Sequence, residues 1–546
     1  MGAEGREKQV AMDTNPSRRA MLQGAAASVL AAAGTAVGAA APALAALPGR
    51  PYPTTGRETT LSRPYPLHEF RGVWVATVLN IDWPSRPGLT IAEQQAELTY
   101  LCKLAGYRGY NAVLLQVRAA GDRLYRSSLG EPWSRYLTGT LGRDPGWDPL
   151  EWAIREAGRW GLQLHAWVNP FRVAMDTSLS SLYPGSYAAR NPGHTYAYGG
   201  RRYLDPGLLA VRRYVRSVLA EIAGRYRVAG IHLDDYFYPY PVPGTPIPDG
   251  AAYAAYGGGL TLGDWRRENI RRFVRDAGPD IHALNPRAAF SISPFGIWRH
   301  LTSSPLGSAT SGLQAYDDLY VDTRRWLKSQ YADLFVPQLY WQLGHPTADY
   351  SVLARWWNEA ARDTRTQLAF GEAVYKMGSA GWTDPNELRN HVTLTRSLSR
   401  MDGNGFYNAS AMKANVLGGS SRVSSTHYTR RALPLRMPWL GSTGPEAPAF
   451  TRVTAGTAGV RLEWTVPAAG VPAAWLALWR RPAVSTDVPR LPSTAEHLAL
   501  VRAGAPGAGT WTDATAVRGQ RYWYILQSFS QNATGSVAGS AIMTTA

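Results

Sequence analysis

The chain has 546 residues, enough for two or three domains and at least one large hydrophobic core. Hydrophobic residues make up 45% of it and charged residues 18%, an ordinary globular composition that excludes wholesale disorder. Lys and Arg number 57 against 40 Asp and Glu, so the formal net charge is +17 and acidic polymers are favoured as partners. The single cysteine, Cys102, excludes an intramolecular disulfide and a cysteine-rich metal site.

The aromatic and basic residues narrow the class of partner. There are 20 Trp and 29 Tyr but only 11 Phe, and large rings with a polar edge suit surfaces that stack on polar ligands. The basic residues are scattered as single arginines and Arg-Arg pairs, without a Lys/Arg block, a zinc-finger pattern or a helix-turn-helix pattern. We therefore expect no nucleic acid partner.

Residues 1–46 have the pattern of a twin-arginine signal peptide. Arg18 and Arg19 precede an Ala/Gly-rich, weakly apolar stretch over residues 24–41, and small residues at 43–45 suit a signal peptidase. Glycines interrupt the apolar stretch, which makes it a poor permanent membrane span. This pattern predicts export by the twin-arginine route to an extracellular or cell-envelope location, with no permanent membrane anchor.

Residues 47–68 are rich in Pro, Thr and Arg and are predicted to be a linker, and residues 69–440 follow with a βα rhythm. The predicted strands are short apolar or alternating runs, over residues 72–77, 112–118, 162–169, 230–235, 289–293, 334–340, 367–373 and 405–409. The helical patterns between them include residues 91–104, 150–160, 208–225, 262–275 and 352–361. Eight strands alternating with helices predict an α/β fold, a (β/α)8 TIM barrel. An open doubly wound sheet is the alternative, but no Gly-rich phosphate loop follows the first strand.

Residues 445–546 change to short alternating strands with no helices between them. Examples are residues 460–464, 475–479 and 522–526. About 100 residues of such strands predict a small all-β sandwich of the immunoglobulin or fibronectin type III kind, with Trp464 and Tyr522 as core aromatic residues.

Chemistry in a (β/α)8 barrel lies at the carboxyl ends of the strands, and alternation tells which side chains face the lumen. If the apolar residues of each run face the helices, the polar ones between them face inward. These inward residues are Gln116 and Arg118, then His165, Trp167 and Asn169, then His232 and Asp234, with Gln338 and Tyr340 sharing one face. Stacking rings, amides and a carboxylate are what a sugar-binding site requires.

Asp234 and Asp235 are the most specific pair of candidate catalytic residues in the sequence. Adjacent carboxylates repel, so one can hold a proton near neutral pH. Glycoside cleavage needs an acid for the leaving oxygen and a second carboxylate, or an equivalent group, at the oxocarbenium-like centre. A helix cap or a turn is the alternative interpretation of the pair, and a metal site is another, although no metal-ligand spacing accompanies it.

The second carboxylate is left open by the sequence. Glu372 lies at the end of the seventh predicted strand, where many barrel glycosidases have a nucleophile, but alternation with Leu368 and Phe370 would point it at the helices. Asp82, after the first strand, is a rival that would otherwise brace a loop. Asp317 and Asp322 are further possibilities, while Asp384 with Glu387 is interpreted as a helix cap followed by its N3 acid.

Several of these segments resemble the glycosyl hydrolase-like 10 family. The resemblance runs in order from about residue 68 to 420, through residues 70–74, 80–85, 116–118, 165–170, 204–207, 233–238, 293–299, 322–326, 337–341 and 375–378. It implies a (β/α)8 glycoside hydrolase of the cell wall, since the family includes a divisome-localised enzyme that cleaves peptidoglycan glycan strands whose stem peptides have been removed. It also implies active-site roles for Asp234 and Asp235 and lumen roles for Arg118 and Asn169. The family has an aliphatic residue where Glu372 stands, and so does not support Glu372 as the nucleophile.

We therefore expect an exported glycoside hydrolase of peptidoglycan glycan strands, without a cofactor or a metal. The catalytic candidates are Asp234, Asp235 and Glu372. The substrate-binding candidates are Asp82, Arg118, His165, Trp167, Asn169, Arg172, Tyr236, Trp298, Gln338, Tyr340 and Trp341. The alternatives are a carbohydrate-binding envelope protein with little or no catalysis, and a hydrolase of another extracellular polysaccharide.

Overall fold

The computed structural model describes residues 66–234, 236–441, 443–484, 496–503, 506–536 and 540–546. The predicted signal peptide, almost all of the predicted linker and Asp235 lie outside these described residues. Within the described part of the chain, no helix combines the length and the apolar character needed to cross a bilayer.

A ring of parallel strands forms the centre of the fold. In order around the ring, with their bounds, the strands are β1 (Phe70–Val75), β2 (Ala112–Arg118), β3 (Gln163–Val168), β7 (Gly230–Leu233), β8 (Ala289–Ile292), β9 (Leu334–Phe335), β10 (Gln367–Leu368) with β11 (Phe370–Ala373), and β12 (Gly403–Tyr407). The seventh position is divided at Ala369, so that β10 pairs with β9 while β11 pairs with β12. Because β12 also pairs with β1, the ring closes. The predicted (β/α)8 barrel is confirmed, and the open-sheet alternative is wrong.

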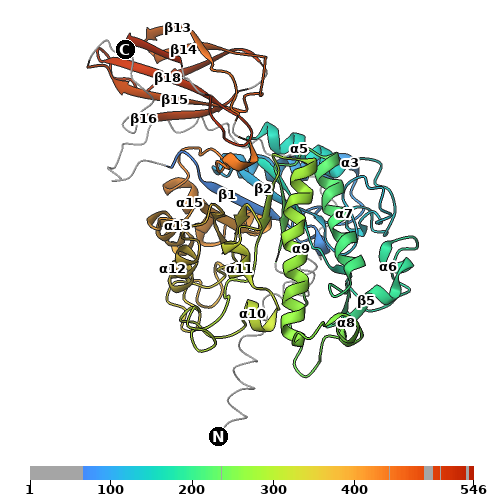
Figure 1. Cartoon of the computed structure of the whole chain (residues 1–546). Coiled ribbons are helices and arrows are strands. Elements are labelled where there is room, and N and C mark those ends of the chain that lie inside the picture. The colour runs from blue at the N-terminus through green and yellow to red at the C-terminus, as the bar shows by residue number, and fades with distance from the viewer. Residues whose placement is uncertain (1–65, 235, 442, 485–495, 504–505, 537–539) are drawn as a thin grey trace, which may run out of the picture. The chain divides into compact units, whose positions relative to one another are not determined.

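Helices follow the strands and surround them (Figure 1). The longer ones are α3 (Ile91–Tyr107), α5 (Pro149–Arg159), α7 (Leu209–Arg225), α9 (Leu262–Leu284), α12 (Tyr350–Ala360), α13 (Glu387–Ser397) and α15 (Gly419–Thr426). The shorter elements are η1 (Val78–Asn80), α4 (Arg135–Thr138), β4 (Arg172–Ala174), α6 (Tyr187–Arg190), η2 (Pro192–His194), β5 (Thr195–Tyr198), β6 (Arg201–Leu204), α8 (Gly250–Tyr256), α10 (Ala315–Asp318), α11 (Thr323–Lys328), η3 (Val374–Lys376), α14 (Ala409–Ala414), η4 (Val416–Gly418) and η5 (Pro438–Leu440). Local sequence sets the helix starts: α3 begins with a capping box between Thr90 and Glu93.

Alternation along the strands divides the buried side chains into an outer and an inner set. Val113, Leu115 and Val117 of β2 pack in the large cluster between the strands and the helices. Leu114 of β2 belongs instead to a second cluster inside the ring, together with Trp167 of β3. The inward and outward faces predicted for these strands are therefore confirmed.

The C-terminal part consists of two antiparallel sheets. One has the order β13 (Ala449–Gly456), β14 (Gly459–Val466), β17 (Gly507–Asp513), and the other has the order β16 (Glu496–Arg502), β15 (Trp475–Pro482), β18 (Arg521–Phe529), β19 (Ser540–Thr545). Leu462 and Trp464 of the first sheet share one core with Leu478 and Tyr522 of the second. The predicted small all-β sandwich is confirmed, including the core positions of Trp464 and Tyr522.

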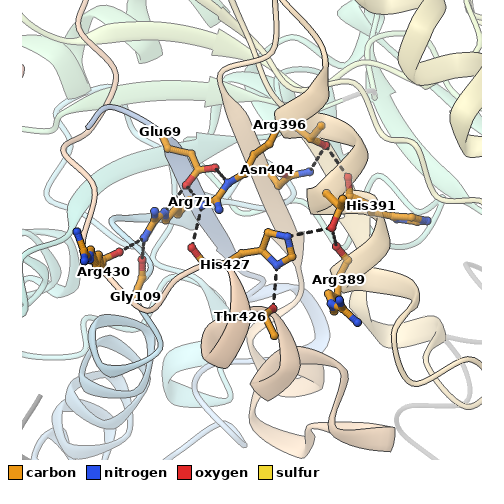
Figure 2. A network of polar contacts seen from close by, with 12 residues as sticks. Glu69, Arg71, Gly109, Arg389, His391, Arg396, Asn404, Thr426, His427 and Arg430 are labelled. Atoms are coloured by element: carbon orange, nitrogen blue, oxygen red, sulfur yellow. Dashed lines mark hydrogen bonds and ion pairs between the residues drawn. The ribbon is translucent and has the colours of Figure 1, made fainter. Parts of the chain in front are cut away.

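A buried ionic network fastens the start of β1 to the helix layer (Figure 2). The Arg71 guanidinium, which is fully buried, donates to Glu69 at 2.6 Å and to the Arg430 carbonyl at 2.7 Å. Arg396, near the end of α13, donates to both carboxylate oxygens of Glu69, at 2.7 and 2.8 Å. Burial disfavours the charged carboxylate, but Arg71 and Arg396 outweigh it and hold the pKa of Glu69 below its ordinary value.

We predict that Glu69→Gln lowers the free energy of unfolding by about 3 kcal/mol, because it leaves the buried Arg71 charge uncompensated. A carboxylate with a depressed pKa stabilises the fold above its ordinary pKa, and this contribution is lost as the pH falls through the depressed value. The difference between variant and wild type in urea denaturation should therefore shrink in acid. The control is Glu359→Gln in an exposed ion pair with Arg362, where a change of at most about 1 kcal/mol is expected. Equal effects of the two variants would contradict the prediction.

Candidate active site

Asp234 stands at the exit of β7 and is held there by three donors. The side-chain amide of Asn169 and the indole N–H of Trp167, the latter at 3.3 Å, both donate to its Oδ2. The backbone N–H of Tyr236 donates to Oδ1 at 3.1 Å. All three donors come from the carboxyl ends of β3 and β7, which are neighbours in the ring. Asp234 is 5% exposed, and these donors fix its carboxyl group in one orientation.

Asn169 is itself fixed from β2. Gln116 donates to its side-chain oxygen at 2.7 Å, which leaves the amide N–H₂ directed at Asp234. Arg118 donates to the backbone carbonyl of Asn169 at 2.6 Å and pairs with Glu131 at 2.6 Å. The Arg118 side chain is fully buried. Contrary to our expectation, it supports Asn169 from behind and does not contact a sugar, because Glu131 and the backbone carbonyls of Asn169 and Pro170 use its donors.

Aromatic rings gather around Tyr407, the last residue of β12. Its ring centroid lies 6.4 Å from those of Trp74 and Trp167, 6.2 Å from that of Tyr340 and 5.8 Å from that of Tyr375. Trp167 also donates to Asp234, so the ring cluster and the carboxyl group are contiguous. Tyr407 is half-buried, which leaves part of this cluster accessible.

The two lumen histidines are buried below Asp234. Trp74 donates to His232 at 3.2 Å, and His232 also bonds Ser291 at 2.8 Å. His165 pairs in register with Gly230, while Trp167 pairs with His232, so His165 lies one layer deeper than Trp167. Burial lowers the pKa of His165 to about 4 and that of His232 well below its ordinary value, so both are neutral. His165 therefore fills the lumen and is not placed to contact a sugar.

Glu372 points away from the lumen, as alternation indicated. Its carboxylate is fully buried against the helix layer. Tyr350 of α12 and Asn404 donate to Oε1 at 2.7 and 2.6 Å, and His391 of α13 bonds Oε2 at 2.7 Å. We assign Glu372 a structural role and remove it from the catalytic candidates, because no part of its carboxylate is open to a substrate.

The other rival carboxylates are engaged in local structure. Asp82 accepts the backbone N–H groups of Ala76 and Ser410, at 2.7 and 2.8 Å, and burial raises its pKa to about 6. Asp317 pairs with Arg299 at 2.8 Å. Asp322 caps α11 and accepts the indole N–H of Trp298 at 3.0 Å. Asp82 and Trp298 therefore brace loops, contrary to the substrate contacts that we expected of them.

The remaining predicted residues lie around the strand exits. The Gln338 amide, after β9, donates to the Ser293 carbonyl at 3.0 Å. Tyr340 stacks on Tyr407, while the half-buried ring of Trp341 packs edge-on against Phe295. The half-buried Tyr236 lies under the Arg172 guanidinium.

A cavity of about 150 Å³ lies beside the β2 exit. Arg118, Asp122 and Glu131 supply polar groups to its wall, and Tyr136 and Tyr187 supply rings. Among the residues that the structure describes, no group of three or more His, Cys, Asp or Glu side chains is placed to hold a metal ion.

Sequence reasoning missed Tyr407 and Glu131. Tyr407 carried a usable signal, because Phe406 is an outward apolar residue and alternation places the next side chain in the lumen. Glu131 lies in an irregular loop, where no periodicity relates it to Arg118. Its position required the folded structure.

We predict that Glu372→Gln destabilises the protein without removing activity. Burial would lower the pKa of His391, but Glu372 and Glu387 outweigh burial and raise it from 6.5 to about 9. A raised histidine pKa gives stability that is complete below pH 6.5 and is lost as the pH rises through about 9. Melting temperatures from about pH 6 to about pH 10 should therefore fall for the wild type and change less for the variant. A well-folded Glu372→Gln protein without activity would restore Glu372 to the chemistry.

Comparison with known proteins places the chain in a family. It matches the family Glycosyl hydrolase-like 10 over residues 69–387. It is 40% identical to the glycosyl hydrolase YngK of Bacillus subtilis over 71% of this chain and 77% of that protein. It is 36% identical to the glycosyl hydrolase DigH of Escherichia coli K12 over 61% of this chain and 81% of that protein.

Solved structures give a more distant likeness. The PgaB (BpsB) glycoside hydrolase domain of Bordetella bronchiseptica is 15% identical, with a TM-score of 0.43 over 65% of this chain and 98% of that one.

The family match covers more than half of the chain and contains both Asn169 and Asp234. The chain therefore belongs to the glycosyl hydrolase-like 10 family, and it is a glycoside hydrolase.

Proposed function

We propose that this protein cleaves glycosidic bonds in peptidoglycan glycan strands, with the Asp234 carboxyl group as general acid and base. The observation that carries this proposal is the set of three donors that fixes Asp234 at the exit of β7. A positioned carboxyl group at a strand exit is the feature that glycoside cleavage in a barrel requires. The sequence resemblance to a family with a peptidoglycan hydrolase supports the choice of polymer.

In this mechanism Asp234 gives its proton to the glycosidic oxygen as the bond to the anomeric carbon breaks. Water then adds to the anomeric carbon, and a carboxylate takes the proton that the water loses. Asn169 and Trp167 keep the Asp234 carboxyl group from rotating away from the bond during these steps. Asp235 is our candidate for the assisting carboxylate, and it lies outside the described residues.

The rings near Asp234 suit the faces of sugars. Tyr236, Trp341 and Tyr407 are each half-buried, so one part of each ring is anchored while another part is accessible. Flat faces of pyranose rings carry C–H groups that pack well on such rings, while the sugar hydroxyls need polar partners at the edges. We therefore assign these three residues to substrate binding.

We predict that Asp234→Asn lowers kcat on peptide-free peptidoglycan strands by about 10³-fold, because the amide cannot transfer the proton. Reducing ends released over time measure the reaction. The matched control is Asp363→Asn, an exposed loop residue with φ of 62°, a conformation that Asn also tolerates. Equal rates for wild type and Asp234→Asn would remove Asp234 as the acid.

The same assay separates the alternative functions. Tight binding of the strands without turnover would favour a carbohydrate-binding protein. Turnover of another polysaccharide, with the peptidoglycan strands left intact, would keep the glycosidase chemistry and replace the substrate.

We also propose that the protein works outside the cytoplasmic membrane, on the strength of the twin-arginine pattern in residues 1–46. Replacing Arg18 and Arg19 together by lysine should hold the full-length precursor in the cytosol. Fractionation followed by immunoblotting measures this. Export of the double variant at the wild-type level would contradict the proposed route.

A further inference from the structure

Arg172 is a buried arginine next to Tyr236 that the proposed reaction has not used. It is the first residue of β4, in the segment that leads away from β3, and it is 3% exposed. Its Nε donates to the carbonyl of Ala119, at the exit of β2, at 2.9 Å. The guanidinium carbon lies 5.4 Å from the ring centroid of Tyr236, whose backbone N–H donates to Asp234. Arg172 is therefore anchored between the exits of β2 and β7.

The charge of Arg172 has no counterion in the described part of the chain. No described carboxylate lies within ion-pair distance of it, and Nε makes the one hydrogen bond of its side chain there. The terminal nitrogens are not among the fully enclosed polar atoms, so they keep contact with the exterior. The other buried arginines of the described barrel differ. Arg71, Arg118 and Arg266 are each paired with a carboxylate at 2.6 Å. Arg202 and Arg212 lack an ion pair there, but their terminal nitrogens donate to carbonyl or side-chain oxygens.

An arginine without a partner is costly at this burial, because the guanidinium has lost much of its water without gaining a compensating charge. Proteins keep such a group where a ligand supplies the missing charge. The positive charge also reaches the phenol of Tyr136, where burial raises the pKa to about 12, Asp122 adds to the rise and Arg172 opposes it. Tyr136 lines the 150 Å³ cavity, so the charge of Arg172 also acts on the wall of that cavity.

We propose that Arg172 binds a carboxylate carried by a sugar ring of the substrate, and so makes this site selective for acidic glycans. The proposal rests on the proposed glycosidase function and adds the feature of the sugar that is recognised. The planar fork of two terminal nitrogens matches the two oxygens of a carboxylate, and one guanidinium balances one negative charge.

In peptidoglycan strands without stem peptides, the lactyl carboxylate of each muramic residue is free, whereas attachment of a peptide converts it to a neutral amide. Contact with Arg172 would therefore distinguish the two kinds of strand by charge. The Tyr236 ring lies close to the guanidinium carbon and the Ala119 carbonyl accepts from Nε, so the guanidinium is anchored before the ligand arrives.

The test compares two substrates that differ only in this charge: peptide-free strands, and the same strands with the lactyl carboxyls coupled to methylamine. The ratio of kcat/KM on the acidic strands to kcat/KM on the amidated strands should be at least about tenfold for the wild type. Arg172→Met should bring the ratio to about one by slowing only the acidic substrate. Arg172→Lys keeps the charge without the fork and should give an intermediate ratio through a raised KM.

Arg213→Met, an exposed arginine on α7, is the matched control and should keep the wild-type ratio. Thermal melts establish that each variant is folded, and Arg172→Lys carries the test if Arg172→Met does not fold. A wild-type ratio near one, or an unchanged ratio in a folded Arg172 variant, overturns the proposal.

Failure of the inference and failure of the proposed function are distinguishable. If the wild type hydrolyses both substrates equally, the glycosidase function stands and carboxylate recognition falls. If it hydrolyses neither, the glycosidase function falls, and calorimetric titration with the two strand preparations tests whether Arg172 recognises the carboxylate. Preference for the acidic strands that disappears in Arg172→Met supports the inference, and equal binding of both overturns it.

Discussion

The hydrogen-bonded series Gln116–Asn169–Asp234 is the constraint on which the chemistry of this protein depends. Its members come from β2, from the residue that follows β3 and from the residue that follows β7, which are consecutive positions around the ring. Each member is inward-facing because the alternate residues of its strand pack against the helices. A slip of one residue in any of these strands would turn a member outward and break the series. The register of the barrel strands therefore also determines the geometry of the site.

Because the site depends on the register of the strands, the alternation of each strand predicted part of the site from the sequence. Strands buried on both faces are apolar on the outside and carry polar residues only where the lumen needs them, so Asn169 and Asp234 were recognisable as inward and near each other. The division of the seventh strand at Ala369 was not recognisable, because it depends on pairing with two different neighbours. Arg118 was correctly placed inward, but its burial depends on Glu131, which no local pattern connects to it.

Glu372 shows that analogy with other barrel glycosidases misleads where the alternation of the strand does not. A carboxylate at the end of the seventh strand suits the general plan of barrel glycosidases, yet alternation pointed it outward and the structure agrees. The interpretation of Asp384 and Glu387 as a cap with its N3 acid was wrong. Helix α13 begins at Glu387, and that carboxylate accepts from Leu343 at 2.6 Å and bonds His391 at 2.9 Å. A fully buried histidine between two glutamates requires contacts between distant segments that sequence spacing does not reveal.

The Glu69–Arg71–Arg396 network is built where β1 starts, whereas Asp234 lies where β7 finishes. The ionic network and the proposed catalytic carboxyl group thus lie at opposite ends of the barrel strands. Mutations in the loops beyond the carboxyl ends of the strands can therefore alter which polymer is bound without disturbing the Glu69–Arg71–Arg396 network. Such a scaffold is suited to laboratory evolution, in which those loops would be randomised while Arg71 and Arg396 are kept.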